Sequence, residues 1–103
     1  MAKIIWTQTA LDDTNAIAEY ISLDSFFYAN QFVERIFLAA IKLERYPEIG
    51  KIVPELLAHK YREKIFKKSR IIYRIDSSDV YIISVHHSSR LLSNNEHFKD
   101  LFE

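Results

Sequence analysis

Basic side chains concentrate in one short stretch of the sequence. Between Lys60 and Arg74 there are seven Lys and Arg residues and one acid, Glu63, for a local charge of +6. The seven are Lys60, Arg62, Lys64, Lys67, Lys68, Arg70 and Arg74. Such a region attracts phosphates or carboxylates. The same pattern suits the solvent face of a strand, where charge discourages edge pairing, and the sequence leaves both interpretations open.

The chain as a whole is neutral, with 14 Lys and Arg residues against 14 Asp and Glu residues. Residues 1–50 hold 4 basic and 7 acidic side chains (net −3), and residues 51–103 hold 10 basic and 7 acidic ones (net +3). A protein that binds many phosphates needs a strongly basic surface, since counterion release supplies much of the affinity. Neutrality therefore favours a protein partner over a nucleic acid.

Several catalytic chemistries are excluded by missing residues. The single glycine, Gly50, rules out a dinucleotide fingerprint and a P-loop, which need several glycines. Without cysteine there is no thiolate nucleophile, disulfide or zinc ribbon, and no Gly-x-Ser-x-Gly turn exposes a serine. The histidines have no metal-ligand spacing, so we expect neither a metal nor a cofactor. These histidines are His59, His86, His87 and His97.

The length of 103 residues predicts a single domain over residues 1–103. The longest apolar run, residues 36–41, is far shorter than the ~20 residues that span a bilayer, and residues 1–6 lack the apolar core of a signal peptide. We therefore expect a cytoplasmic protein with no membrane partner. Seven Phe, six Tyr and one Trp are many for so short a chain, so part of the aromatic surface is expected to meet a partner.

Apolar periodicity predicts two helices in the first half. A β-branched and aromatic run at residues 2–7 predicts a preceding strand. Thr9, with Asp12 three residues later, predicts the cap of a helix that ends near Ile21. After a break at Ser22–Ser25, a second helix is predicted to run to Pro47. Its apolar stripe consists of Ala29, Phe32, Val33, Ile36, Ala40 and Leu43.

The second half predicts strands joined by short polar turns. Residues 51–59 are expected to form a connection, followed by strands at Tyr61–Phe66, Arg70–Ile75 and Val80–His86. Strict alternation places Ile71, Tyr73 and Ile75 on one face of the second, and Tyr81, Ile83 and Val85 on one face of the third. Residues 93–103 predict a short helix. The order β-α-α-β-β-β-α predicts an α+β fold, a two-helix layer on a mainly antiparallel four-stranded sheet.

Several fragments in a fixed order resemble one known family. They are Ile5-Trp6-Thr7 with Ala10, Asp13, Ile17 and Tyr20-Ile21; Leu43 to Pro47 with Gly50; Val53-Pro54-Glu55; Arg62-Glu63; Arg70 to Ile75; and Val85 to Arg90. Together they resemble the RelE/ParE superfamily of type II toxin-antitoxin modules, closer to its ParE-like members. Thr14 departs from the pattern, because the family more often has leucine there. The resemblance implies a toxin held inactive by an antitoxin partner.

The superfamily contains two mechanisms. ParE-like members poison DNA gyrase, whereas RelE-like members cut messenger RNA in the ribosomal A site. Under the endoribonuclease alternative, the resemblance implies that Arg70 stabilises the phosphate and Glu55 is the base. His87 would be the acid, since histidine titrates near neutral pH. Each also has a structural interpretation: Arg70 as one half of an ion pair on a hairpin, Glu55 as a turn residue and His87 as the end of a strand.

The RelE-like catalytic set is incomplete. Its second arginine falls on Ser88, and no tyrosine follows Arg90. We therefore favour a ParE-like toxin that binds gyrase, with the antitoxin in an apolar groove beside the helices. The predicted target-binding residues are Arg62, Lys64, Arg70, Tyr73, Arg74, His87 and Arg90. The alternatives are a ribosome-dependent endoribonuclease acting on messenger RNA and a non-toxic binding module with the same fold.

Overall fold

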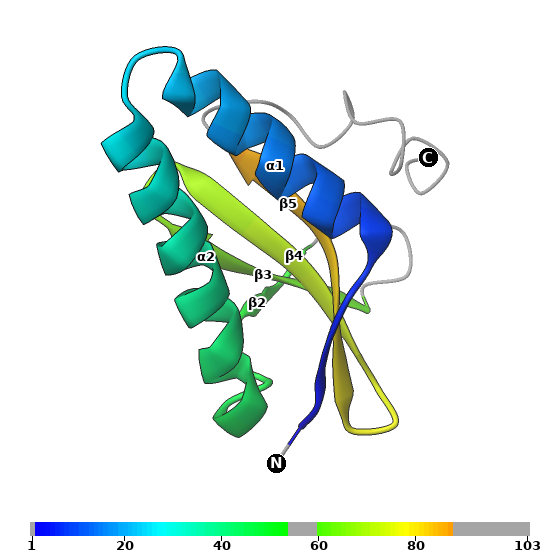
Figure 1. Ribbon diagram of the computed structural model, residues 1–103. Coiled ribbons are helices and arrows are strands. Elements are labelled where there is room, and N and C mark those ends of the chain that lie inside the picture. Colours follow the sequence, from blue (N-terminus) through cyan, green and yellow to red (C-terminus); the bar gives the residue numbers. More distant parts are fainter. Residues whose placement is uncertain (1, 54–59, 88–103) are drawn as a thin grey trace.

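Two helices cover one face of a five-stranded sheet (Figure 1). The computed structural model describes residues 2–53 and 60–87. The elements are β1 (Ile4–Trp6), α1 (Gln8–Ser22), α2 (Phe26–Arg45), β2 (Lys51–Ile52), β3 (Tyr61–Phe66), β4 (Ser69–Asp76) and β5 (Asp79–His87). The predicted α+β class is confirmed, and each of the three long strands lies within one residue of its predicted bounds.

The sheet has the strand order β1-β5-β4-β3-β2, in which β1 runs parallel to β5 and the other pairs are antiparallel. The prediction of four strands was wrong by one. Residues 51–59 were expected to be a connection only, but Lys51 and Ile52 pair with Glu63 and Arg62 as the edge strand β2. Two residues are too few to show an alternating pattern, so the sequence carries no signal for this strand.

Helix α1 begins two residues earlier than predicted. Its cap is Thr7, not Thr9: the Thr7 hydroxyl accepts a hydrogen bond from the Ala10 amide at 3.2 Å. The backbone amide of Thr7 still donates to the Ile82 carbonyl of β5 at 3.2 Å. The chain therefore leaves the sheet and enters the helix at this one residue, which explains why the cap lies so close to β1.

Helix α2 follows its predicted pattern. The Ser25 hydroxyl caps it by accepting from the Tyr28 amide at 3.2 Å, and the helix ends at Arg45, before Pro47. Five of the six predicted stripe residues are buried, Val33 is half-buried, and Ala39 is an added core residue. Because the stripe packs on the sheet, the opposite side of α2 is left to solvent.

A bulge in β5 interrupts the β4–β5 ladder. Ile72 lies opposite Ser84 but Tyr73 lies opposite Ile82, so Ile83 has no residue directly across from it. An extra residue of this kind reverses the side-chain alternation beyond it. The sequence shows no break here, since β5 is apolar on both sides of the bulge.

The bulge corrects one predicted face. Strict alternation placed Val85 with Tyr81 and Ile83, but Val85 lies in the core beneath the helices, whereas the other two belong to a cluster on the opposite face. Asp13 of α1 holds the bulge, because its carboxylate accepts hydrogen bonds from the Ser84 hydroxyl and, at 3.0 Å, from the Val85 amide. This contact fixes α1 against β5.

The main core lies between the helices and the sheet. Its buried residues include Phe32, Ile36, Leu43, Ile71, Tyr73 and Ile82. A smaller buried cluster on the other face contains Val53, Tyr61, Ile72 and Ile83. In the part of the chain that the structure describes, neither helix is long and apolar enough to cross a membrane. The predicted helix at 93–103 lies outside the described residues.

Candidate functional site

Arg70 lies on the sheet face away from the helices and is already paired. Its guanidinium donates to both carboxylate oxygens of Glu63, with Nε–Oε1 at 3.2 Å and Nη2–Oε2 at 2.6 Å. Only 21% of the Arg70 side chain and 11% of the Glu63 side chain are exposed. A two-pronged pair of this kind fixes the guanidinium plane, so Arg70 is held by its neighbour on β3.

His87 points to the other face of the sheet. Arg70 lies directly opposite His86 in the β4–β5 ladder, so these two share a face, and His87 is turned toward the helices. The His87 Nδ1 lies 3.0 Å from the Ser69 hydroxyl, and the ring stands edge-on to Phe32 at 5.6 Å between centroids. Burial, and to a lesser degree the positive charge of Lys68, lowers the pKa of His87 below 6.5.

The three predicted catalytic residues are therefore not brought together among the described residues. Arg70 and His87 lie on opposite faces of the sheet. Glu55 lies outside the described residues, as do Arg90 and two of the histidines. Within residues 2–53 and 60–87, no group of three His, Asp or Glu side chains is arranged to hold a metal ion.

Tyr73 has a structural position instead of a surface one. Its side chain is fully buried, and its hydroxyl donates to the Pro47 carbonyl at 2.8 Å and accepts from the Gly50 amide at 2.8 Å. Burial raises the pKa of this phenol above 10, although the Gly50 hydrogen bond opposes the shift. A neutral hydroxyl can donate and accept at once, so Tyr73 ties the α2–β2 loop to the sheet and presents no surface to a target.

Arg62 stabilises the same loop. Its Nη1 donates to the Gly50 carbonyl at 2.8 Å and to the Glu48 carbonyl at 3.3 Å. A Cβ atom added at Gly50 would lie 2.5 Å from the Tyr73 hydroxyl and 2.7 Å from the Glu63 carbonyl oxygen. The single glycine is thus required by a close approach between the loop and the sheet.

Arg74 lies on the same face as Arg70 and is packed on a ring. Its guanidinium carbon lies 5.4 Å from the Tyr81 ring centroid, and its Nη2 lies 3.8 Å from Asp76. The Arg74 Nε is buried and has no hydrogen-bond partner among the described residues. Three of the predicted target-binding arginines, Arg62, Arg70 and Arg74, therefore have contacts that order their side chains.

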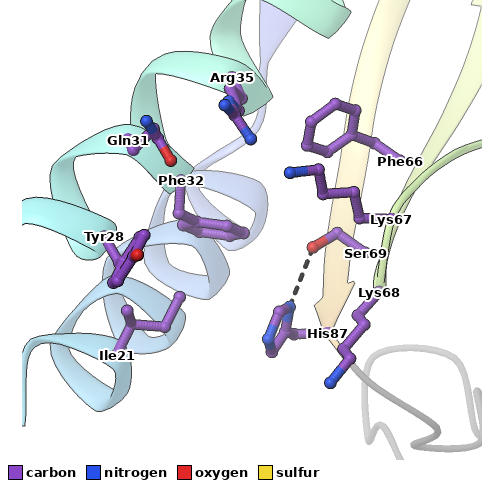
Figure 2. Close-up of a pocket in the computed structure, with 10 residues that line it drawn as sticks. All are labelled: Ile21, Tyr28, Gln31, Phe32, Arg35, Phe66, Lys67, Lys68, Ser69 and His87. Carbon is purple, nitrogen blue, oxygen red and sulfur yellow. Dashed lines mark hydrogen bonds between the residues drawn. The ribbon is translucent and has the colours of Figure 1, made fainter. Parts of the chain in front are cut away.

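A pocket lies on the helix side of the sheet, between α2 and the β3–β4 hairpin. Figure 2 shows Phe66 and Lys67 facing Arg35, Phe32 and Tyr28, with the hydrogen-bonded pair Ser69 and His87 between the two sides. Its volume is about 240 Å³. The remaining lining residues are Ile21, Gln31 and Lys68. The walls are mostly apolar, and the charged groups among the described lining residues are all cations.

A wider groove runs along α2 beside β3. Its volume is about 660 Å³, and it is lined by Arg35, Leu38, Ala39, Ile41, Lys42, Lys64, Ile65, Phe66 and Lys67. Among the described residues that were predicted to bind the target, Lys64 lines this groove. Sequence reasoning did not find the α2 side, although Arg35, Leu38 and Lys42 recur at helical spacing beside the buried stripe.

Comparison with known proteins agrees with this architecture. Residues 4–92 match the family model described as the ParE toxin of the type II toxin-antitoxin system parDE. The chain belongs to this toxin family. It is 34% identical over 92 residues to "Toxin RelE2" of Caulobacter vibrioides, a match that covers 88% of this chain and 100% of the relative. The predicted RelE/ParE membership is confirmed.

Two solved structures have the same fold. A chain from the chromosomal ParDE TA system of P. aeruginosa superimposes with a TM-score of 0.71 and 20% identity, covering 86% of this chain and 98% of that one. A chain from the toxin-antitoxin complex RelBE2 of Mycobacterium tuberculosis superimposes with a TM-score of 0.64 and 22% identity, covering 84% and 96%. At these identities the likeness is one of fold.

Family membership gives several fragments of the sequence pattern a structural meaning. Asp13 holds the β5 bulge, Thr7 caps α1, and Tyr73 with Gly50 closes the α2–β2 loop. These fragments therefore specify the fold.

Proposed function

We propose that this type II toxin acts as a ParE-like inhibitor of DNA gyrase and is neutralised by a cognate antitoxin. One observation carries the proposal: Arg70 is paired with Glu63 on one face of the sheet, and His87 lies on the other face. Cleavage of RNA needs a base, an acid and a phosphate-stabilising cation around one reacting bond. A protein-binding toxin needs no such arrangement.

The target-binding surface of this proposal lies on the face away from the helices. Arg70 and Arg74 are held there in fixed orientations by Glu63 and by the Tyr81 ring. Arg90, the fourth arginine predicted to bind the target, lies outside the described residues. Ordered arginines lose little side-chain entropy on binding, which favours their use at protein interfaces.

The test is a supercoiling assay with purified gyrase and relaxed plasmid. Added toxin should inhibit supercoiling or accumulate cleaved plasmid in proportion to its concentration. Arg74→Ala should raise the toxin concentration needed by about tenfold, whereas Lys3→Ala, an exposed lysine near the β1 edge, should leave it unchanged. Normal supercoiling at saturating toxin would overturn the proposal.

The second candidate is a ribosome-dependent endoribonuclease, favoured by the similarity to a relative named RelE2. Its roles remain those implied by the resemblance, with Arg70 at the phosphate, His87 as acid and Glu55 as base. Translating ribosomes incubated with the toxin would then release messenger cut within A-site codons, and Arg70→Lys would slow the cutting. Intact messenger together with inhibited gyrase would support the first mechanism. Unimpaired growth on expression would indicate a non-toxic binding module.

A further inference from the structure

The solvent side of α2 carries a second periodic set of residues, which we call the outer stripe. Its members are Phe27, Gln31, Glu34, Leu38, Ile41 and Arg45. They follow one another at spacings of 4, 3, 4, 3 and 4 residues, the alternation at which two helices pack along each other. Gln31 is half-buried and the others are exposed. Figure 1 shows α2 along the margin of the helix layer, where this side can meet another molecule.

The middle of the outer stripe is apolar, and a charge lies on each side of it. Leu38 and Ile41 are 52% and 53% exposed, and neighbouring apolar side chains on a solvated face, bordered by charges, mark an interaction site. Glu34 lies one turn before them and Arg45 one turn after. In the part of the chain that the structure describes, neither Glu34 nor Arg45 has an ion-pair partner.

The order Glu34, Leu38, Ile41, Arg45 is complementary to itself when reversed. If a second copy of α2 lies antiparallel across the first, with the two-fold axis between Leu38 and Ile41, then Leu38 faces Ile41 of the second copy. Glu34 then faces Arg45 of the second copy, because both are equally far from the axis. A two-fold axis makes every contact occur twice, so the pair of helices gains two apolar contacts and two ion pairs.

Other helix pairings lack this complementarity. In a parallel pair, Glu34 would face Glu34 and Arg45 would face Arg45, and like charges at facing positions repel. An antiparallel pair with its axis between Gln31 and Glu34 would place Phe27 against Leu38. That pairing would also bring the two Glu34 carboxylates close together and leave Arg45 without an acid. The charges therefore favour the antiparallel arrangement centred between Leu38 and Ile41.

One flank of this arrangement opposes association. Arg35 and Lys42 lie on the same side of the outer stripe, so antiparallel pairing brings Arg35 of one copy near Lys42 of the other. A single helix-to-helix contact also buries less than the roughly 1,200 Å² of a stable interface. The association is therefore weak, with a dissociation constant on the order of 10 μM.

We infer that the outer stripe of α2 is a self-association surface, on which a second copy of this toxin binds antiparallel. Leu38 and Ile41 form the centre of the contact, and Glu34 and Arg45 pair across the two-fold axis. Because Leu38 and Ile41 also line the groove along α2, the second copy covers one wall of that groove. The inference concerns the toxin by itself and does not rest on the gyrase proposal.

The first test is sedimentation equilibrium of the purified full-length toxin at concentrations around the expected dissociation constant. Glu34→Arg and Arg45→Glu should each weaken the dimer about tenfold, because each changes two symmetric contacts. The exchanged variant Glu34→Arg/Arg45→Glu should recover the wild-type dissociation constant. Lys42→Glu should strengthen the dimer about threefold, because a carboxylate then faces Arg35 of the second copy.

The matched control is Glu19→Arg, which makes the same change of charge at an exposed position of α1, away from the outer stripe. Its dissociation constant should stay within about twofold of the wild-type value. A toxin that remains monomeric at about tenfold above the expected dissociation constant, equal losses in Glu34→Arg and Glu19→Arg, or no recovery in the exchanged variant would each overturn the inference.

The second test uses the absence of cysteine from the chain, which makes an engineered cysteine the only thiol. A mixture of Glu34→Cys and Arg45→Cys should form a disulfide-linked dimer under mild oxidation. Glu34→Cys alone should not, since its two copies would lie about 16 Å apart along the helix axis, beyond the reach of a disulfide. Self-crosslinking of Glu34→Cys would indicate a parallel or shifted pair and would overturn the antiparallel arrangement. Inhibition of gyrase is measured separately, so failure of one proposal is distinguishable from failure of the other.

Discussion

The arginines and lysines of the β3–β4 hairpin occupy two different environments. On the face away from the helices, Arg70 pairs with Glu63 and Arg74 packs on Tyr81. On the helix side, Lys64 and Lys67 line the groove along α2, where the charged side chains among the described lining residues are all basic. Alternation along each strand separates the two groups, since neighbouring residues point to opposite faces.

This difference shows that a sum of charges along a sequence does not locate the available positive charge. The local excess of +6 already sets Glu63 against one cation, and the structure identifies that cation as Arg70, whose pair with Glu63 orders the hairpin. Lys64 and Lys67 keep their charge in the groove. We therefore expect substitution of Arg70 to alter stability most, and substitution of the exposed lysines to alter it least.

The largest expected effect is that of Arg70→Ala. The substitution leaves the Glu63 carboxylate, 11% exposed, without its partner, and an unpaired, nearly buried charge destabilises a fold by about 3 kcal/mol. Urea unfolding followed by circular dichroism should show this loss. Lys67→Ala is the matched control on the helix side, where an exposed side chain should change the free energy of unfolding by less than about 0.5 kcal/mol.

A double variant tests whether the loss of stability in Arg70→Ala comes from the unpaired Glu63 carboxylate. Arg70→Met/Glu63→Leu removes both charges and should recover most of the lost stability, because a buried pair often contributes little beyond its apolar replacement. If Arg70→Ala and Lys67→Ala had equal effects on unfolding, the division between a structural and an accessible group of cations would be wrong.

A smaller loss is expected when the α2–β2 loop is loosened. Gly50→Ala places a Cβ atom 2.7 Å from the Glu63 carbonyl oxygen, a backbone atom that cannot turn away, and such overpacking costs about 2 kcal/mol. Tyr73→Phe leaves the Gly50 amide and the Pro47 carbonyl without their buried partner, at a cost of about 1 to 2 kcal/mol.

Both variants should lower the urea midpoint without changing the slope of the transition. Gly50→Ser is a useful companion to Gly50→Ala, since it also adds a Cβ atom and should be at least as destabilising. Gyrase inhibition that survived in the folded fraction of Tyr73→Phe would agree with a structural role for Tyr73. Inhibition lost with full retention of stability would restore the sequence-based assignment of Tyr73 to the target surface.

The sequence was a sufficient guide wherever one periodic pattern covered a whole element. The stripe of α2, the start of α2 after the break at Ser22–Ser25 and the three long strands were all predicted within a residue or two. In each case burial on one face imposes a periodic spacing of apolar residues along the element. This spacing can be recognised in the sequence without knowing which helix or strand the element packs against.

Features that depend on a second element could not be predicted in this way. The bulge at Ile83 is held by Asp13, which is 70 residues away in the chain, and the helix cap moved to Thr7 because that residue also bonds to β5. The candidate site shows the same limit. Arg70 and His87 looked like one constellation in the sequence, but the register Arg70–His86 places them on opposite faces.

The burial of His87, on the helix side of the sheet, can be tested through the pH dependence of stability. The pKa of His87 is lower in the folded state than the ordinary value of 6.5, because burial disfavours the charged ring. The unfolded chain therefore binds a proton more readily than the folded one as pH falls below about 6.5, and stability decreases in that range. Above that pH, His87 makes no pH-dependent contribution.

Thermal unfolding at pH 7.5 and pH 5.5 should show this decrease in the wild type and a smaller one in His87→Gln, which cannot be protonated. The difference between the two proteins isolates His87 from the other acid-titrating groups. An identical pH dependence in both would mean that the His87 ring is not buried as the structure shows.

The smallest expected effect concerns Lys68 and separates charge from burial at the pocket beside His87. Lys68 is the second cause of the lowered His87 pKa, after burial. Lys68→Ala should therefore raise the His87 pKa part of the way toward 6.5, measured from the imidazole carbon-bound proton signals during an NMR titration. Lys60→Ala, an exposed lysine that does not line this pocket, should leave the pKa unchanged. Salt screens the lysine charge but not the desolvation. High salt should therefore raise the His87 pKa of the wild type toward that of Lys68→Ala, and should leave the His87 pKa of Lys68→Ala nearly constant. Equal responses of the His87 pKa to salt in the two proteins would show that the Lys68 charge does not reach the pocket beside His87.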